Sequence, residues 1–208
     1  MGQHGPREER RSHPNMNRDE LMENPYAPLP NRAMELCAKI NAPPRLVAHL
    51  TIVHETARKL VAKLLAEFPA LDFDTQAVLF GAATHDLGKV IHGQELSQSG
   101  RLHEQRGVEL LKEHGVPEHL ARFAYTHNNW KPTDSPQFED LLVALADKTW
   151  KAKRIPELEA LTTSLLAEKT CKPEWECYAI LDNILQDLSA NADACLLYTS
   201  FAFSLNSP

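Results

Sequence analysis

Residues 81–90 read Gly-Ala-Ala-Thr-His-Asp-Leu-Gly-Lys-Val, and the pair His85-Asp86 at their centre decides how the rest of the chain is interpreted. From Ala77 to Thr84 the sequence carries no charged residue, which is typical of a buried helix. A histidine and a carboxylate at the end of such a helix enter an apolar interior. Burying a charge is costly unless it is paired or coordinates a metal. The pair therefore indicates a metal site, provided that other ligands converge on it.

Apolar residues recur at helical spacing along most of the chain. The clearest helix starts at Pro44, a residue suited to the first turn, and continues to Phe68. The helix that ends at the His-Asp pair can be capped by Asp72 or Asp74. Strand patterns are absent, so we predict an all-α fold. Further helices are predicted over residues 31–40, 103–114, 117–128, 138–153, 156–168 and 173–191, with a loop over 89–102.

The length of 208 residues predicts one domain with flanking segments. Seven of the 14 prolines fall within residues 1–44, and the first residues are highly charged, so residues 1–30 are interpreted as a flexible lead-in. The domain is expected over 31–195, with the motifs inside 43–155. Residues 196–208 are expected to form a tail, to which the sequence assigns no role.

Charge and composition exclude several classes of protein. A net charge of −6 gives no reason to expect a nucleic-acid partner, whose binding surface is usually basic. No apolar run reaches the roughly 18 residues of a membrane span, and the polar start is not a secretory signal. The four cysteines form no Cys-x-x-Cys pair, so we expect free thiols in a cytoplasmic protein.

Five further residues are candidates to join the pair. His49 and His54 lie on opposite flanks of the apolar stripe of the long helix, and periodicity alone does not choose between them. His103 opens a predicted helix and His127 ends one. Asp147 lies in an apolar helix interior, where an unpaired carboxylate would be costly. The sequence therefore contains enough donors to complete a metal site.

The order of these residues resembles the HD-domain metal-dependent phosphohydrolases, a helical superfamily defined by a His, a His-Asp pair and a distant Asp. The resemblance covers about residues 43–155 and rests on Arg45-Leu-Val-Ala-His49, His85-Asp86-Leu-Gly-Lys89, His103-Glu-Gln-Arg-Gly107, His127 and Ala146-Asp147-Lys148. It implies an HD-domain helical bundle. It also favours His49 over His54, because His49 occupies the position of the family's first ligand.

The resemblance implies a first metal with four ligands: His49, His85, Asp86 and Asp147. His103 and His127 match the additional histidines of subfamilies that bind a second metal bridged by Asp86. One departure weakens the second site, because some two-metal members have paired histidines where this chain has His127-Asn128. We therefore expect one or two ions per chain. The missing Gly-Tyr-Pro signature argues against a cyclic dinucleotide as substrate.

Imidazole and carboxylate ligands together favour Fe, Mn, Co, Ni or Zn, with Mg as a further candidate. A bound metal lowers the pKa of its water and supplies hydroxide as the nucleophile at working pH. Besides Asp86, we expect Lys89 to act in catalysis by neutralising a phosphate oxygen. Arg45 lies one helical turn before His49 and is a second candidate substrate contact. The basic run from Lys148 to Arg154 is interpreted as a solvated face.

The sequence thus predicts a metal-dependent phosphohydrolase that cleaves a phosphate mono- or diester or anhydride of a small metabolite, for which we expect a nucleotide. A di-iron oxygenase of HD type is an alternative, which Lys89 disfavours. A non-catalytic module held together by metal is another, although six candidate ligands exceed the four of a closed structural site. A homodimer is compatible with the sequence.

Overall fold

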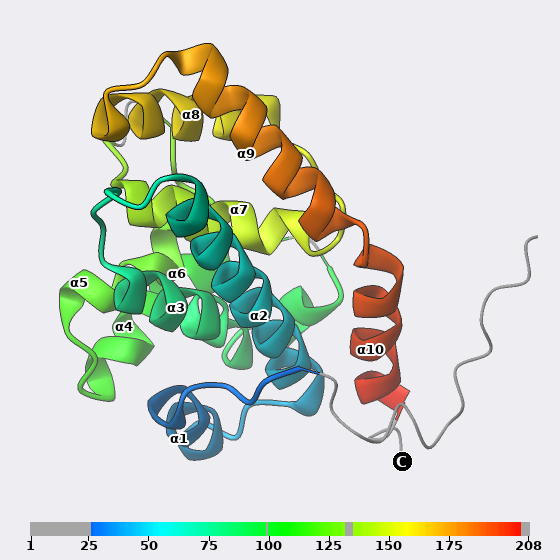
Figure 1. Ribbon diagram of the computed structural model, residues 1–208. Coiled ribbons are helices and arrows are strands. Elements are labelled where there is room, and N and C mark those ends of the chain that lie inside the picture. Colours follow the sequence, from blue (N-terminus) through cyan, green and yellow to red (C-terminus); the bar gives the residue numbers. More distant parts are fainter. Residues whose placement is uncertain (1–25, 99, 132–134, 205–208) are drawn as a thin grey trace, which may run out of the picture.

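The computed structural model describes residues 26–98, 100–131 and 135–204, with side chains as far as residue 200. Within these ranges the chain forms helices and no strand, so the predicted all-α fold is confirmed (Figure 1). The longer helices are α1 (Asn31–Lys39), α2 (Pro44–Glu67), α3 (Thr75–Thr84), α4 (Leu102–Glu113), α7 (Phe138–Thr149), α8 (Pro156–Thr170), α9 (Glu174–Ser189) and α10 (Ala192–Ser204). The short ones are η1 (Leu87–Val90), η2 (Gly93–Leu96), α5 (Glu118–Ala121) and α6 (Phe123–Thr126).

Helix α2 forms the centre of the bundle and packs against α3, α7, α9 and α10 (Figure 1). Pro44 is its first residue, where the missing N–H of proline costs no hydrogen bond. Its apolar stripe, which includes Leu50, Val53 and Leu60, is fully buried. Burial of this stripe against several neighbours fixes which face of α2 looks into the bundle, and with it the direction of His49.

Helix α3 delivers the His-Asp pair into the interior. Of the two candidate caps, Asp74 is the one used, since its carboxylate accepts a hydrogen bond of 2.9 Å from the Ala77 N–H. Gly81 lies under the ring of Phe123, where a Cβ would come within 2.5 Å of the ring. Because Gly81 has no side chain, the end of α3 can pack closely against α6. The backbone N–H of His85, the residue directly after α3, donates a hydrogen bond to the Gly81 carbonyl.

The segment predicted as a loop over 89–102 contains the 3-10 helices η1 and η2. Turns this short carry no apolar periodicity, so the sequence pattern cannot reveal them. Glu95 of η2 accepts hydrogen bonds from the backbone N–H groups of Leu102 and His103, at 3.1 Å each. The segment is therefore tied to the first turn of α4, whose free N–H groups it satisfies.

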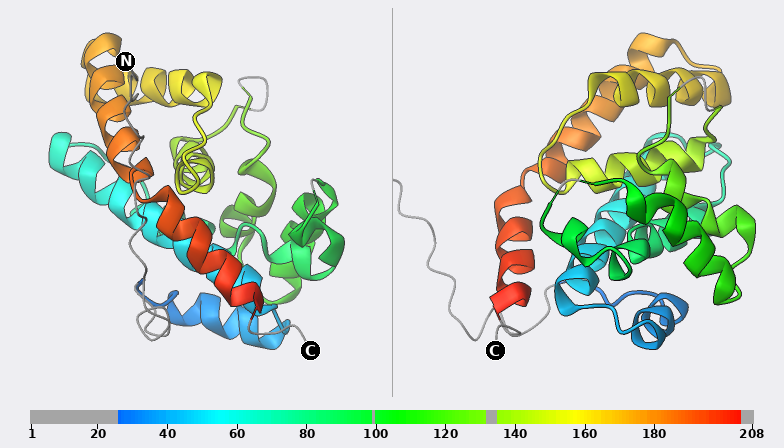
Figure 2. Two further views of the ribbon diagram at one scale, coloured as in Figure 1. Left: turned by 90° about the vertical axis from the view of Figure 1, so that its right-hand side faces the viewer. Right: turned by 180° about the vertical axis from the view of Figure 1, so that it is seen from behind.

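The first described residues contact helix α10, which packs on α2. Residues 1–25 of the expected lead-in lie outside the described residues, but Leu29 is buried and Tyr26 packs edge-on against Tyr198 at 5.0 Å between ring centroids. The expected boundary between 195 and 196 falls inside α10, which lies along α2 (Figure 2). Residues 192–204 are helical, with Ala192 and Cys195 buried against the bundle and Leu196 and Leu197 exposed.

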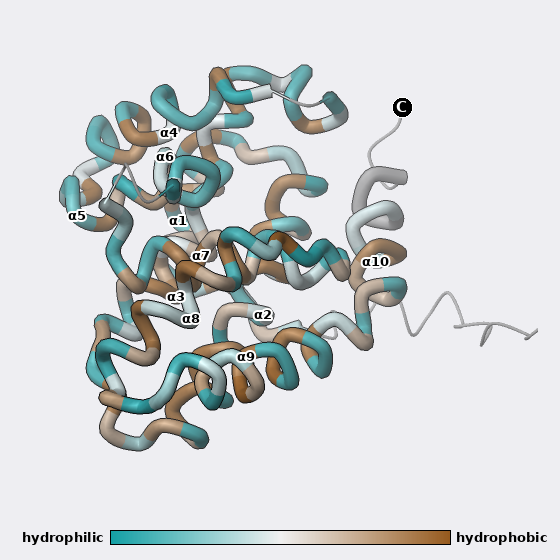
Figure 3. Tube along the Cα trace, turned by 90° about the horizontal axis from the view of Figure 1, so that it is seen from above, coloured by the Kyte–Doolittle hydropathy of each residue, from teal (hydrophilic) through white to brown (hydrophobic). Residues whose placement is uncertain are grey.

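The outer helices have one apolar face and one polar face, as expected of helices that cover one side of a core. Along α9, hydrophobic and hydrophilic residues alternate around successive turns (Figure 3). Leu181 and Leu185 face inward, whereas Trp175 and Tyr178 are exposed. Among the described residues, no helix combines the length and the apolar character needed to cross a membrane.

Candidate metal centre

Six candidate ligands from five parts of the chain meet at one place inside the bundle. His49 comes from α2, the His-Asp pair from the end of α3, and Asp147 from α7. His103 lies in the first turn of α4 and His127 directly follows α6. All except His49 are at most 5% exposed. The fold therefore brings together residues that are almost one hundred positions apart in the sequence.

The two oxygens of Asp86 face different histidines. Oδ2 lies 3.0 Å from His49 Nε2 and 3.6 Å from His85 Nε2. Oδ1 lies 3.1 Å from His103 Nε2 and 3.6 Å from His127 Nε2. A carboxylate held in this way can serve a ligand group on either side, as expected for the bridging residue of a two-metal site.

Asp147 completes the group on the Oδ2 side. Its Oδ1 lies 3.6 Å from His49 Nε2 and 3.7 Å from His85 Nε2. His49, His85 and Asp147 each offer a ligand atom, and these atoms lie within 4.8 Å of one another. A second group with the same property consists of His85, Asp86 and His127. His54 belongs to neither group, which agrees with the choice of His49.

Hydrogen bonds at the far side of each ring orient the histidines. His85 donates from Nδ1 to the Ala82 carbonyl and His127 donates from Nδ1 to the Phe123 carbonyl, both at 3.1 Å. His103 pairs through Nδ1 with the carboxylate of Glu95. An N–H at Nδ1 leaves the lone pair on Nε2, the atom that points at the centre. Partners of this kind are typical of metal-binding histidines.

Several polar atoms at the centre are buried and make no hydrogen bond: the Nε2 atoms of His49, His85 and His103, and Oδ1 of Asp86. Buried polar atoms are satisfied in almost all folded proteins, so a cluster of unsatisfied ones calls for an explanation. The three nitrogens are lone-pair donors that lie 3.0–3.6 Å from the carboxylate oxygens of Asp86. A divalent cation would satisfy them together, so the residues fit the metal that the sequence implies.

The pKa values of His49, His127 and both carboxylates are shifted toward the forms that bind metals, whereas Asp86 and Glu95 outweigh burial and raise the pKa of His103. Burial lowers the pKa of His49, and it lowers the pKa of His127 to about 3 with help from neighbouring His85. Burial acts to raise the pKa of Asp86 and Asp147, but the surrounding histidines and lysines outweigh it and hold both well below the ordinary value. Neutral imidazoles and ionised carboxylates are the forms that bind metals.

Three lysines surround the two carboxylates. Lys89 Nζ lies 2.5 Å from Asp86 Oδ2, and Lys148 Nζ lies 2.5 Å from Asp147 Oδ2. Lys151 Nζ lies 3.7 Å from the other oxygen of Asp147. The interpretation of this basic run as a solvated face is wrong for Lys148, whose side chain is only 12% exposed. Its position directly after Asp147 was the signal that could have placed it at the site.

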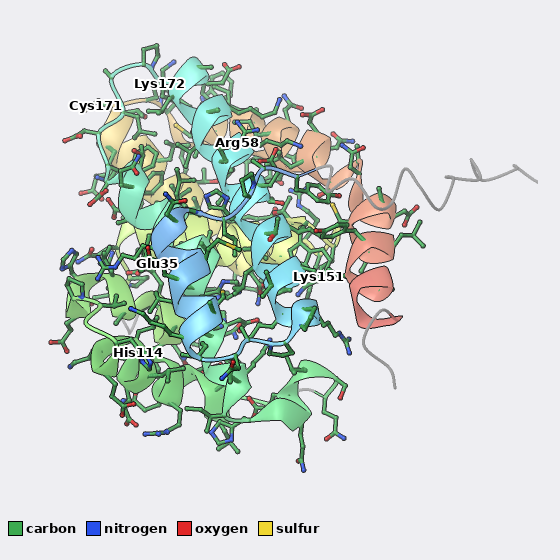
Figure 4. The ribbon with its side chains drawn as sticks, turned by 90° about the horizontal axis from the view of Figure 1, so that it is seen from below. Glu35, Arg58, His114, Lys151, Cys171 and Lys172 are labelled. Atoms are coloured by element: carbon green, nitrogen blue, oxygen red, sulfur yellow. The ribbon has the colours of Figure 1, made fainter. Side chains whose placement is uncertain are left out.

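A pocket of about 200 Å³ opens beside the centre. Lys151 extends into the region between α2 and α10, seen from below in Figure 4. Trp150 stands edge-on to His49 with ring centroids 5.5 Å apart, and it closes one side. The lining residues combine cations with apolar side chains: Arg45, Leu46, His49, Lys89, Leu96, Trp150, Lys151 and Thr199. Both predicted substrate contacts, Arg45 and Lys89, are among them.

Sequence reasoning missed Glu95 and Trp150. Glu95 orients His103 from a segment that was expected to be an irregular loop, and a glutamate eight positions before a histidine gives no signal by itself. Trp150 is buried and in contact with His49, although it follows the motif that contains Asp147 by only three residues. Its proximity in sequence to that motif was the available clue.

A comparison with known families agrees with this geometry. A family model described as HD domain matches residues 45–151, which is just over half of the chain and includes all six candidate ligands. Comparisons with curated proteins and with solved structures found no match. Members of the matched family bind divalent metals and are generally metal-dependent phosphohydrolases. With a helical fold, a His/Asp cluster that could hold a metal, and this match, the chain belongs to the HD domain family.

Proposed function

We propose that this protein is a metal-dependent phosphohydrolase whose substrate is a small phosphomonoester, and that this substrate is a nucleotide. One observation carries the proposal: the pocket beside the His/Asp cluster is lined by three cations, Arg45, Lys89 and Lys151. A pocket with three positive side chains suits an anion of more than one negative charge.

The ion pairs of the centre explain how the lysines become available to a substrate. Lys89 is balanced by Asp86, and Lys151 lies near Asp147. A divalent ion held by both carboxylates would compensate their charge. Lys89 and Lys151 would then keep a positive charge that faces the pocket. A phosphate dianion is a fitting partner for that charge, whereas a diester carries a single negative charge.

The division of roles follows from position. A divalent ion, when bound, supplies Lewis acidity and an activated water at neutral pH. His49, His85, Asp86 and Asp147 would hold that ion. Lys89 would bind a phosphoryl oxygen beside Asp86 and stabilise the negative charge that grows there during the reaction. Arg45 and Lys151 would fix the orientation of the phosphate in the pocket.

The apolar part of the pocket supports a substrate with a non-phosphate moiety. Leu46, Leu96 and Trp150 line the pocket together with the cations. Apolar lining with a few placed polar groups is usual for small-molecule sites. A sugar or base attached to the phosphate would contact these three side chains, and this supports a nucleotide over inorganic pyrophosphate.

The exposure of His49 favours a catalytic centre over a structural one. Its side chain is 16% exposed and lines the pocket, so the centre can be reached from solvent. Structural metals are normally closed off by four protein ligands. The surrounding lysines favour phosphate chemistry over an oxygenase, because oxygen activation does not require cations beside the metal ligands.

The proposal is tested by stripping the full chain of metal with a chelator and reloading it separately with Mn, Fe, Co, Ni, Zn or Mg. Phosphate release is then measured from nucleoside monophosphates, sugar phosphates, a phosphodiester and a dinucleoside polyphosphate. We expect metal-dependent release, fastest from nucleoside monophosphates, and equal turnover without oxygen. Asp147→Asn should be inactive, with His54→Ala as the active control. Preference for the diester would overturn the monoester assignment, and consumption of oxygen would favour an oxygenase.

A further inference from the structure

His127 differs from the other histidines of the centre because both of its ring nitrogens have partners. Nδ1 donates to the Phe123 carbonyl at 3.1 Å. Nε2 lies 2.8 Å from the side-chain nitrogen of Asn128. By contrast, the Nε2 atoms of His49, His85 and His103 make no hydrogen bond. The lone pair that His127 would offer to a metal is therefore already engaged within the protein.

Neighbouring groups fix the orientation of the Asn128 amide. Lys148 Nζ, which can only donate, lies 2.7 Å from the oxygen Oδ1 of Asn128. On the other side, Nδ2 of Asn128 lies 3.3 Å from a carboxylate oxygen of Glu104, a residue that is 3% exposed. A rotated amide would place its oxygen against Glu104 and its NH₂ against Lys148. The donor Nδ2 is therefore the atom that faces His127.

The positive charge of Lys148, like the hydrogen bond from Asn128, opposes metal binding at His127. The Lys148 side chain is 12% exposed, and its ammonium group lies against Asn128, the neighbour of His127. A second divalent ion bound to His127 would lie in the field of this cation. Repulsion between like charges is strong where water is largely excluded. Without His127, Asp86 Oδ1 has His103 Nε2 beside it at 3.1 Å, while His85 Nε2 is shared with the first group.

We infer that Asn128 engages the lone pair of His127 and thereby limits the centre to one metal ion, held by His49, His85, Asp86 and Asp147. His127 then acts as a positioning residue rather than a ligand. The inference rests on the metal centre of the proposed function and adds its stoichiometry. Asn128 stands where the sequence departs from the paired histidines of some two-metal relatives, and the contacts of its amide give that departure a physical consequence.

Asn129 offers a matched control. Its Nδ2 also donates to Glu104, at 2.8 Å, and to the Tyr125 carbonyl, while its oxygen accepts from Arg101. It belongs to the same polar network, but these hydrogen bonds involve neither His127 nor Lys148. Asn129→Ala therefore disturbs Glu104 without releasing the His127 lone pair. Asn128→Ala removes the amide, and Lys148→Met removes the donor that fixes its orientation.

The test is a titration of untagged, metal-free full-length protein with Mn²⁺ by calorimetry, with bound Mn counted by mass spectrometry and spin coupling read by EPR. We expect one tight ion per chain in the wild type and in Asn129→Ala, with an uncoupled spectrum. Asn128→Ala should gain a second, weaker binding event and a coupled Mn pair. Lys148→Met should gain the same event, and circular dichroism checks that each variant is folded.

Two tight ions in the wild type would overturn the inference while leaving the proposed function intact. It would also be overturned if folded Asn128→Ala and Lys148→Met both stayed at one ion. A wild-type chain that binds no Mn²⁺, and none of the other divalent metals, would overturn the proposed function together with the inference.

Discussion

Gly88 of η1 lies against Gly107 of α4, backbone on backbone. A Cβ at Gly88 would approach the Gly107 backbone to 2.8 Å and would overlap the carbonyl oxygen of His103. Because Gly88 follows Asp86 by two residues, this close approach determines how near the carboxylate comes to the His103 ring, which is 3.1 Å away. The Gly in Asp-Leu-Gly-Lys is thus a packing requirement of the metal centre.

Gly88→Ala should destabilise the protein by about 3 kcal/mol, at the upper end of what overpacking costs, because the obstructing atoms belong to backbone. Metal affinity should fall because a shift of η1 displaces Asp86 from His49 and His85. Gly93→Ala is the matched control, since a Cβ there meets nothing within 4 Å. Denaturant unfolding and metal content are the measurements. Equal stability of the two variants would contradict the packing account.

Substitution of the two histidines of α2, His49 and His54, should have different effects on metal binding. His49→Ala should lose bound metal because His49 Nε2 lies 3.0 Å from Asp86 in the cluster. His54→Ala should retain metal, since His54 lies five residues further along the helix and contributes to neither ligand group. Metal content after gel filtration is the readout. Metal loss from the His54 variant alone would show that the register of α2 is wrong.

Substitutions of Asp86 and Lys89 should have different effects on metal content, although the two side chains are in contact. Asp86→Ala should abolish metal retention and turnover together, because Asp86 is one of the four residues that would hold the ion. Lys89→Ala removes a phosphate contact but no ligand, so metal content should survive while kcat/KM falls about 10²-fold, as for the loss of one charge-stabilising donor. The two variants are compared by metal analysis and steady-state kinetics. An apo Lys89 variant would contradict this division of roles.

Acid sensitivity should arise in part at a carboxylate that is not a candidate metal ligand. The two hydrogen bonds from Arg58, 2.7 and 2.8 Å long, lower the pKa of Glu55, a buried carboxylate of α2. A pKa depressed in the folded state contributes stability above the unfolded value of about 4.3, and that contribution is lost as the pH falls through the folded value. Glu55→Gln should therefore destabilise the protein by about 1 kcal/mol at pH 7, because Arg58 is half exposed and solvent weakens the pair.

The difference between Glu55→Gln and wild type should shrink below about pH 4. Urea unfolding at a series of pH values measures it. Glu113→Gln, which removes an exposed carboxylate of α4, serves as the control and should leave stability nearly unchanged. A difference that is constant with pH would show that the Arg58 pair is not its source.

The helices and the residues of the His/Asp cluster could be predicted because most of them have a strong local signal. Long apolar periodicity locates α2, and the uncharged run before His85 locates α3. The choice of His49 required the family resemblance, since periodicity treats His49 and His54 alike. The burial of α2 on several sides supplies the physical reason, because it leaves His49 as the histidine that faces the cluster.

Other features depend on contacts that no local pattern records. Glu95 caps α4 and orients His103 across a segment without periodicity. Lys148 resembles a surface lysine in sequence, and only the fold places it between Asp147 and Asn128. Helix α10 could not be predicted for the same reason, because its packing depends on contacts with α2 and Tyr26 that are distant in sequence.

The most direct test of the central claim is phosphate release from a nucleoside monophosphate as Mn²⁺ is added stepwise to metal-free protein. The account predicts no release without metal and a rate that rises in proportion to occupancy until one ion is bound per chain, with Asp147→Asn inactive throughout. Release that is unaffected by chelation, or that is the same in Asp147→Asn, would contradict the claim that this His/Asp cluster is the catalytic metal centre.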